Sequence, residues 1–209
     1  AHKRAAQPLV SDAKVALEKL GAALGKHRFP DPDFAARIRW FQTTDTLFAA
    51  PKGNELPTDA QVIGAVQRNA GKQSLIMCAA GTMPGALHVL WRAARGGYHM
   101  EYGYSCMGYE IAGAMGIRMA LPERDVICMV GDGSYMMANS ELATAVMMGV
   151  PFTVVLTDNR GYGCINRLQA ATGGAPFNNL LKDSHHVNEA NLDFVAHARA
   201  MGANAVKAT

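Results

Sequence analysis

Between residues 125 and 134 the sequence reads Asp125-Val-Ile-Cys-Met-Val-Gly-Asp-Gly-Ser134, an apolar run that passes directly into a glycine-containing turn. Such a run, bounded by a turn, predicts a strand that is buried on both faces. The pattern recurs at residues 152–157, which lead into Asp158-Asn159-Arg160-Gly161. Because a helical segment separates the two runs, we expect parallel strands whose carboxyl ends, and therefore both polar loops, share one edge of a sheet.

The rest of the chain continues this alternation of helices and strands. Ser11 can cap a first helix, and Thr58 with Gln61 forms a capping-box start for a later one. With 49% apolar and 18% charged residues, the chain can bury a packed core. The predicted class is α/β, a parallel sheet with helices on both faces. We expect helices at 11–24, 34–48, 58–69, 86–94 (after a turn at 81–85), 108–120, 134–148 and 192–201, and strands at 74–79, 98–100, 125–130, 152–157 and 203–207.

Charge and composition argue against several classes of partner. The chain has 20 basic and 17 acidic residues, a formal charge of +3, and neither half is strongly basic, so we expect no nucleic-acid partner. No stretch offers the roughly 20 predominantly apolar residues of a membrane span, so we expect no membrane partner. Four cysteines without a CxxC pair favour reduced thiols, which predicts a cytoplasmic protein.

The two polar loops carry the residue types of a metal–diphosphate pocket. Asp132 and Asn159 offer two hard oxygen ligands from adjacent strand ends, and Gly133 and Ser134 open a helix whose free N–H groups suit a phosphate. A backbone carbonyl, two diphosphate oxygens and a water would complete an octahedral Mg²⁺ site. Asp-Gly is also common in ordinary turns, but the second loop at a matched strand end favours the pocket.

At these residues the sequence resembles the thiamine diphosphate enzymes. Their motif is Gly-Asp-Gly followed, after roughly two dozen residues, by an Asn-rich end; here Asp158 replaces the usual first Asn. The resemblance implies thiamine diphosphate and Mg²⁺ as cofactors and a thiamine diphosphate-binding (PP-type) domain. It implies that Asp132, Asn159 and the carbonyl of Gly161 bind Mg²⁺, that Gly133 and Ser134 meet the diphosphate, and that Gly81 and Thr82 touch it from another strand end, where the alternative is an ordinary turn.

A second segment, Glu101–Glu110, is similar to the part of that family that holds the aminopyrimidine ring. By this resemblance Met107 is the bulky residue beneath the cofactor that keeps it bent. The carbonyl of Ser105 and the N–H of Met107 would bond the edge of the pyrimidine. The alternative is that Met107 belongs to the core, because methionine fills irregular gaps well.

The local sequence resembles one branch of the family more than others. Residues 102–113, 131–142 and 158–183 are similar to hydrolases of inositol catabolism that open a cyclic 1,2-dione by adding water across a C–C bond, giving a deoxy-glucuronic acid. This implies a small cyclic dione as substrate. Cys164 and Asn166, on an expected helix after the metal loop, are possible substrate contacts, although Asn166 could equally cap or solvate that helix. The alternatives are an acetolactate synthase- or decarboxylase-like enzyme and a non-catalytic cofactor-binding fragment.

The resemblance also divides the chain and predicts what lies outside it. Residues 1–30 would be the end of a central domain, 31–56 a helical linker, and 57–209 the cofactor domain, which we expect to be incomplete at its C-terminal end. In this family a glutamate that activates the cofactor comes from a pyrimidine-binding domain, usually of a neighbouring subunit. We therefore expect no catalytic residue in this chain, a homo-oligomer (dimer or tetramer), and no activity from the chain alone.

Overall fold

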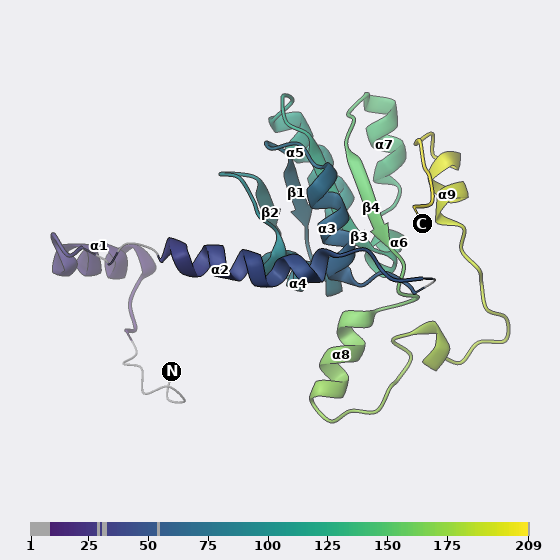
Figure 1. Ribbon diagram of the computed structural model, residues 1–209, viewed down its shortest axis with the longest axis horizontal. Coiled ribbons are helices and arrows are strands. Elements are labelled where there is room, and N and C mark those ends of the chain that lie inside the picture. The colour runs from purple at the N-terminus through teal and green to yellow at the C-terminus, as the bar shows by residue number, and fades with distance from the viewer. Residues whose placement is uncertain (1–8, 29, 31–32, 54, 209) are drawn as a thin grey trace. The chain divides into compact units, whose positions relative to one another are not determined.

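The computed structural model describes residues 9–28, 30, 33–53 and 55–208, and Figure 1 shows the arrangement of its elements. The chain divides into two compact units, Ala1–Thr43 and Thr44–Thr209, which are described separately. The described helices include none that is both long and apolar enough to span a lipid bilayer.

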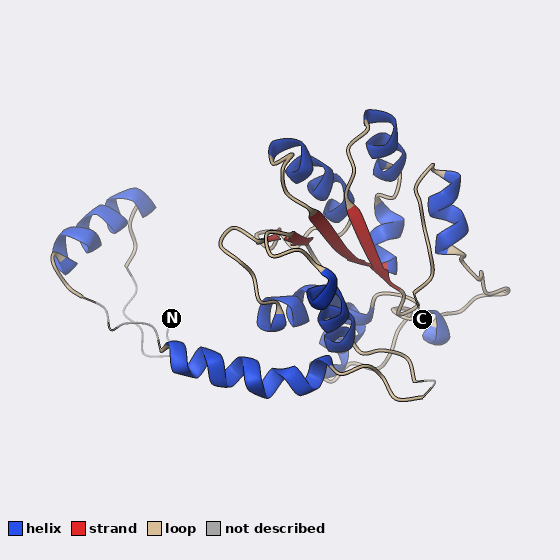
Figure 2. Ribbon diagram, turned by 45° about the horizontal axis from the view of Figure 1, so that its top comes forward, coloured by secondary structure: helices blue, strands red, loops and turns tan. Residues whose placement is uncertain are grey.

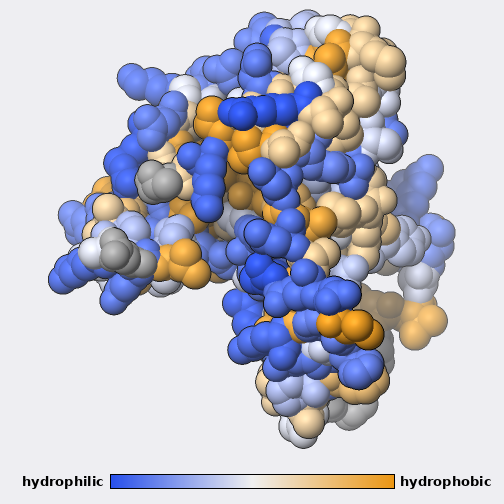
Figure 3. Space-filling model, turned by 90° about the vertical axis from the view of Figure 1, so that its right-hand side faces the viewer, coloured by the Kyte–Doolittle hydropathy of each residue, from blue (hydrophilic) through white to orange (hydrophobic). Residues whose placement is uncertain are grey.

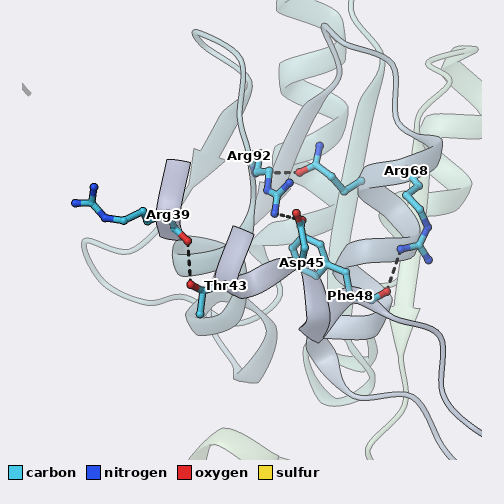
Figure 4. A network of polar contacts seen from close by, with 7 residues as sticks. Arg39, Thr43, Asp45, Phe48, Arg68 and Arg92 are labelled. Atoms are coloured by element: carbon cyan, nitrogen blue, oxygen red, sulfur yellow. Dashed lines mark hydrogen bonds and ion pairs between the residues drawn. The ribbon is translucent and has the colours of Figure 1, made fainter. Parts of the chain in front are cut away.

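The first unit contains α1 (Ala13–Leu24) and most of α2 (Phe34–Asp45). The sequence predicts Ser11 as the cap of α1, and this is wrong: the carboxylate of Asp12 accepts hydrogen bonds from the N–H groups of Lys14 and Val15, at 3.0 and 3.1 Å. Asp12 is one residue nearer the helix, so its side chain reaches the free N–H groups of the first turn. Within α2, the Thr43 hydroxyl donates to the Arg39 carbonyl at 2.9 Å (Figure 4).

The second unit is built on a four-stranded parallel sheet, which confirms the predicted α/β class. Its strands are β1 (Leu75–Cys78), β2 (Tyr98–Met100), β3 (Val126–Gly131) and β4 (Thr153–Thr157), in the order β2-β1-β3-β4. The chain moves outward from β1 to β2 and then returns to the other side of β1 with β3. The order therefore reverses between β1 and β3, and in open sheets of this kind ligands bind at the carboxyl ends of the strands near such a reversal.

Strand side chains point alternately to the two faces of the sheet, so each face presents apolar residues that must be buried. Helices cover both faces, as Figures 1 and 2 show. On one face Ile76, Cys78, Ile127 and Met129 pack with α3 (Asp59–Asn69), α4 (Thr82–Leu90) and Phe48. On the other face Leu75, Met77, Val126, Cys128 and Val130 pack with α5 (Tyr109–Ala120), α6 (Asp132–Met137), α7 (Glu141–Met148) and α9 (Phe194–Ala200).

The predicted capping box of α3 is confirmed. The Thr58 hydroxyl accepts the Gln61 N–H at 3.3 Å, and the Gln61 side chain accepts the Thr58 N–H at 2.9 Å. These reciprocal bonds satisfy two N–H groups that the helix itself leaves without partners.

The 3₁₀ turn η2 (Thr46–Phe48) belongs to the same unit as the sheet. Phe48 is buried against Gly64, where a Cβ atom would lie 2.5 Å from the Cβ of Phe48. Arg68 donates to the Phe48 carbonyl at 3.0 Å, and the Arg92 guanidinium pairs with Asp45 (Figure 4). Residues 44–48 are therefore packed onto the sheet unit, although they lie before residue 56, where the sequence suggests a domain boundary.

Two predicted elements differ from the structure. The helix expected over 134–148 is two helices, α6 and α7, because Asn139 and Ser140 interrupt it: the Asn139 side chain bonds the Met136 carbonyl at 3.3 Å, and Ser140 is the N-cap of α7. The strand expected over 203–207 is not formed. Instead the Arg199 guanidinium bonds the Ala205 carbonyl at 2.7 and 3.0 Å, which ties this segment to α9.

The expected turn at 81–85 is also shorter in the structure. α4 begins at Thr82, with Gly81 as its N-cap, and it ends at Leu90 rather than near residue 94. Beyond β4 lie α8 (Gly163–Ala171) and the 3₁₀ turn η3 (Leu181–Asp183), and Figure 1 shows α8 past the carboxyl end of that strand.

Candidate functional site

A cleft of about 140 Å³ lies at the carboxyl ends of β1, β3 and β4. The cleft is lined by residues from four separate stretches of the chain, and each stretch contains residues that the sequence predicts to be functional. Asn166 is the one predicted contact that does not line it; the Asn166 Oδ1 atom is instead buried without a hydrogen-bond partner in the described part of the chain. The predicted residues that do line the cleft are Gly81, Thr82, Ser105, Met107, Asp132, Gly133, Ser134, Asn159, Gly161 and Cys164.

A larger hollow, about 360 Å³, lies at the opposite edge of the sheet, and its lining includes Ser74, Arg118, Asp125 and Phe152. No predicted functional residue is part of it. We assign the site to the smaller cleft, because the polar loops and the start of α4 converge there, and because ligands of open parallel sheets bind at the carboxyl ends of the strands.

Asp132 joins the two polar loops. It is 7% exposed, and its Oδ2 atom accepts the Gly161 N–H at 2.8 Å while Oδ1 accepts the Asn159 N–H at 3.4 Å. Burial raises the pKa of the Asp132 carboxyl, and these N–H groups act against that rise. The expectation that both loops lie at one edge of the sheet is therefore confirmed, and the cleft contains a buried carboxylate that a cation would stabilise.

The residues around Asp132 fit a magnesium ion. Within the described residues, no three His, Cys, Asp or Glu side chains lie together as a metal site, so a cation here must also use amide and carbonyl oxygens. Asn159 and the Gly161 carbonyl are such donors, and the Gly161 oxygen lies 3.4 Å from the position of a Cβ built on Gly133. Hard oxygen donors with few charges suit Mg²⁺ that is shared with ligand phosphates.

Thr82 contributes a hydroxyl that needs a partner. Its Oγ1 atom is buried without a hydrogen-bond partner among the described residues, although Thr82 lines the cleft. A Cβ atom on Gly163 would lie 3.0 Å from Asn159 Nδ2 and 3.3 Å from Thr82 Oγ1, so the glycine lets both side chains lie close to its backbone. An unpaired buried hydroxyl beside an amide is a group that a ligand oxygen can satisfy.

The Ser134 hydroxyl is already used in hydrogen bonds within the protein. It donates to Glu110 Oε2 at 2.7 Å and accepts the Gly108 N–H at 2.7 Å. Any contact between Ser134 and an anion must therefore use its N–H group. Sequence reasoning missed Glu110; the only signal was a charged residue in the first turn of a largely apolar helix.

Gly133 is confined by an aromatic ring. A Cβ atom at this position would lie 2.7 Å from Cε1 of Tyr162, a residue that sequence reasoning also missed. Tyr162 itself lines the cleft. A side chain at position 133 would therefore require the Tyr162 ring to move.

The loop over residues 101–108 is folded by its own hydrogen bonds. The Glu101 carboxylate accepts the N–H groups of Tyr104 at 3.1 Å and Cys106 at 2.7 Å, and these bonds lower the pKa of Glu101. Ser105 has a φ of 55°, in the left-handed region. Met107 is half-buried and lines the cleft, which favours a ligand contact over the alternative of a core position.

A strap of backbone over residues 179–181 holds the loop that contains Gly161. The Tyr162 N–H donates to the Asn179 carbonyl at 2.6 Å, and the Leu181 N–H donates to the Arg160 carbonyl at 2.9 Å. Gly161 and Leu180 form an antiparallel bridge between these bonds. The strap therefore fixes the peptide groups on both sides of Gly161.

Comparisons with known proteins agree with this geometry. A model of the family described as thiamine pyrophosphate enzyme, C-terminal TPP binding domain, matches residues 79–209. The chain is 39% identical over 201 residues to the 3D-(3,5/4)-trihydroxycyclohexane-1,2-dione hydrolase of Bacillus anthracis (strain CDC 684 / NRRL 3495), covering 92% of this chain and 31% of that protein. It is 35% identical over 237 residues to the protein of the same name from Shouchella clausii (strain KSM-K16), covering 99% and 37%.

The chain thus spans about a third of the length of the curated relatives it matches. Among solved structures, the thiamine diphosphate-dependent 4-hydroxybenzoylformate decarboxylase of Rhodococcus jostii RHA1 matches with a TM-score of 0.64 at 22% identity. That match covers 75% of this chain and 28% of the decarboxylase chain. At this level of identity it supports the fold alone.

Proposed function

The chain belongs to the thiamine pyrophosphate (thiamine diphosphate) enzymes, and we propose that it forms the Mg²⁺- and diphosphate-binding part of a hydrolase that opens the ring of a trihydroxycyclohexane-1,2-dione. The product would be 5-deoxy-glucuronate, formed in inositol catabolism. The relatives that carry the name of this hydrolase support the proposed substrate.

The observation that carries the cofactor part of the proposal is the convergence at Asp132. Its carboxylate bonds the backbone of Asn159 and Gly161, and the same cleft is lined by Thr82, whose hydroxyl has no hydrogen-bond partner among the residues that the structure describes. A diphosphate bridged by Mg²⁺ supplies what these groups lack: a cation for the carboxylate and oxygens for the hydroxyl and the free N–H groups at the start of a helix.

Each group of residues has a separate task in this proposal. Asp132, Asn159 and the Gly161 carbonyl would hold Mg²⁺, and Gly81, Thr82, Gly133 and the Ser134 N–H would hold the diphosphate. Ser105 and Met107 would bind and bend the pyrimidine half, and Cys164 would face the substrate. When bound, the thiazolium would supply the nucleophilic carbon and the electron sink that cleavage of a C–C bond requires. Mg²⁺ held by these residues would serve as a template that positions the diphosphate.

The chain would act as part of a larger assembly. We propose that a pyrimidine-binding domain of a neighbouring subunit supplies the activating glutamate, so that this chain alone is inactive. Exposed apolar side chains support a homo-oligomer: α7 leaves Val146, Met147 and Met148 exposed, and Figure 3 shows hydrophobic residues gathered in patches among hydrophilic ones. The four free cysteines support a cytoplasmic location.

Calorimetric titration with thiamine diphosphate, with and without Mg²⁺, tests the cofactor part. We expect binding that requires Mg²⁺ and is lost in Asn159→Ala. Asn69→Ala is the matched control, because the Asn69 side chain bonds the Ala65 carbonyl within α3 and lies outside the cleft. Binding without Mg²⁺, or equal binding by Asn159→Ala, would contradict the assignment.

A further inference from the structure

Two separate segments that line the cleft meet at one buried carboxylate. Ser105 and Met107 belong to the loop before α5, and Ser134 belongs to the first turn of α6, directly after β3. Glu110, the second residue of α5, accepts the Gly108 N–H at 3.0 Å and the Ser134 hydroxyl at 2.7 Å, both on Oε2. This carboxylate oxygen therefore joins the end of the loop to the first turn of α6.

Glu110 does not line the cleft, and burying its charged side chain costs free energy of folding. Glu110 is 1% exposed and Ser134 is 3% exposed. The other carboxylate oxygen, Oε1, has no hydrogen-bond partner in the part of the chain that the structure describes. An apolar residue would fill this place without the cost of burying an unpaired oxygen, as its neighbour Ile111 does. Compared with an apolar residue of similar size, the carboxylate thus contributes the hydrogen bonds that it accepts from Gly108 and Ser134.

Gly108 also bonds Ser134 directly: its N–H is shared between Glu110 Oε2, at 3.0 Å, and the Ser134 hydroxyl, at 2.7 Å. Gly108 has a φ of 89°, in the left-handed region, and a Cβ atom there would lie 3.2 Å from the Cβ of Met137 and 3.4 Å from that of Ala138. The loop thus lies directly against the end of α6. Glu110 therefore adds two hydrogen bonds to a contact that is also made by packing and by the Gly108–Ser134 bond.

Resting on the proposed function, we propose that Glu110 is a positioning residue that fixes the separation between the pyrimidine half and the diphosphate half of the cofactor site. It acts through Gly108 on the loop with Ser105 and Met107, and through Ser134 on the turn with Asp132 and Gly133. A ligand that spans both halves depends on this separation. A ligand that occupies only the diphosphate half does not.

The test compares Mg²⁺–thiamine diphosphate with Mg²⁺–pyrophosphate by calorimetry on the 209-residue chain. We expect Glu110→Ala to bind thiamine diphosphate about tenfold more weakly, the effect of about one buried hydrogen bond, and pyrophosphate as the unmodified chain does. Glu110→Gln keeps an oxygen acceptor and should restore binding of thiamine diphosphate to within about threefold. Glu123→Ala, an exposed residue, should change neither ligand.

Two further readings separate positioning from a general loss of structure. The effects of Glu110→Ala and Ser134→Ala on thiamine diphosphate binding should not add fully in the double variant, because the two changes share the Glu110–Ser134 bond. Amide NMR spectra without ligand should show shifts at Gly108 and Ser134 in Glu110→Ala and none there in Glu123→Ala.

The outcomes distinguish this inference from the proposed function. If the unmodified chain binds neither ligand, the proposed function fails and the inference falls with it. If the unmodified chain binds both and Glu110→Ala binds both equally well, the inference alone is overturned. If Glu110→Ala loses both ligands together and melts at a lower temperature, Glu110 is only structural and the inference is again wrong.

Discussion

The Oδ2 atom of Asp132 accepts the N–H of Gly161, 29 residues further along the chain, at 2.8 Å. This bond joins the two loops through groups of the protein itself. The carboxylate thus has two functions, one as a hydrogen-bond acceptor and one as a charge, and isosteric replacement can separate them.

Asp132→Asn should preserve the fold but weaken the binding of Mg²⁺. The amide oxygen of asparagine still accepts the Gly161 N–H, but the negative charge is gone. We expect a melting temperature within a few degrees of the unmodified chain and at least tenfold weaker Mg²⁺-dependent binding of thiamine diphosphate. Differential scanning calorimetry and titration measure the two quantities. Equal magnesium-dependent affinity would exclude Asp132 as a ligand.

Gly133→Ala should destabilise the chain, whereas Gly131→Ala should not. A Cβ atom at Gly133 meets the Tyr162 ring at 2.7 Å, while one at Gly131 has nothing within 4 Å. We expect a loss of about 1–3 kcal/mol in the free energy of unfolding for the first change and less than about 0.5 kcal/mol for the second. Urea unfolding without ligand measures both, and equal effects would mean that the ring does not confine Gly133.

Gly161→Ala should release the strap over residues 179–181. The new Cβ atom would overlap the Asn179 carbonyl and lie 2.9 Å from the Leu180 Cα, at a φ of 143°. Hydrogen exchange should become faster at the Tyr162 and Leu181 amides, which donate across the strap. Gly173→Ala is the control, because that glycine also has a positive φ, 83°, but open space around it. Unchanged exchange in Gly161→Ala would contradict the strap.

The contribution of Glu110 to the free energy of unfolding should decrease as pH rises. Burial raises the pKa of the Glu110 carboxyl above its ordinary value, so the folded chain holds this proton more tightly than the unfolded chain does. The contribution of Glu110 to the free energy of unfolding is therefore greatest below the unfolded pKa of about 4.3, decreases as pH rises toward the folded pKa, and is constant above it.

Glu110→Gln removes this titration, and urea unfolding from pH 4 to 8 measures the result. The stability of the unmodified chain relative to Glu110→Gln should decline across that window. Asp132 and Asp59, whose pKa values burial also raises, are present in both proteins and cancel in the difference. The exposed Glu123→Gln should show no such trend, and a difference that rises with pH would reverse the sign assigned to Glu110.

The sheet and much of the cleft lining are predictable from sequence for one physical reason. Buried parallel strands require uninterrupted apolar runs, and the polar residues that follow them must lie at the carboxyl edge. Asp132 and Asn159 could be selected on this basis alone. The family resemblance added Ser105 and Met107, which no spacing argument places in the cleft.

What sequence could not supply depends on contacts between segments far apart in the chain. A glutamate in the first turn of a helix is ordinary, so the one signal, a charge in a largely apolar helix, does not predict that Glu110 bonds Ser134. Residues 203–207 have the apolar pattern of a strand, but the Arg199 side chain binds their backbone instead. By contrast, the break between α6 and α7 could have been predicted from the sequence, because Asn139 and Ser140 mark it.

The helix α8 also bears on how such a protein can change over evolution. None of its residues, Gly163–Ala171, all of which the structure describes, is buried, yet Cys164, Ile165 and Leu168 line the cleft. Substitutions at positions that support no core have little effect on folding. Selection can therefore alter the side of the cleft formed by α8 while Asp132 and its partners, held by the sheet, stay unchanged. The same scaffold is in this way open to new specificities at little risk to its integrity.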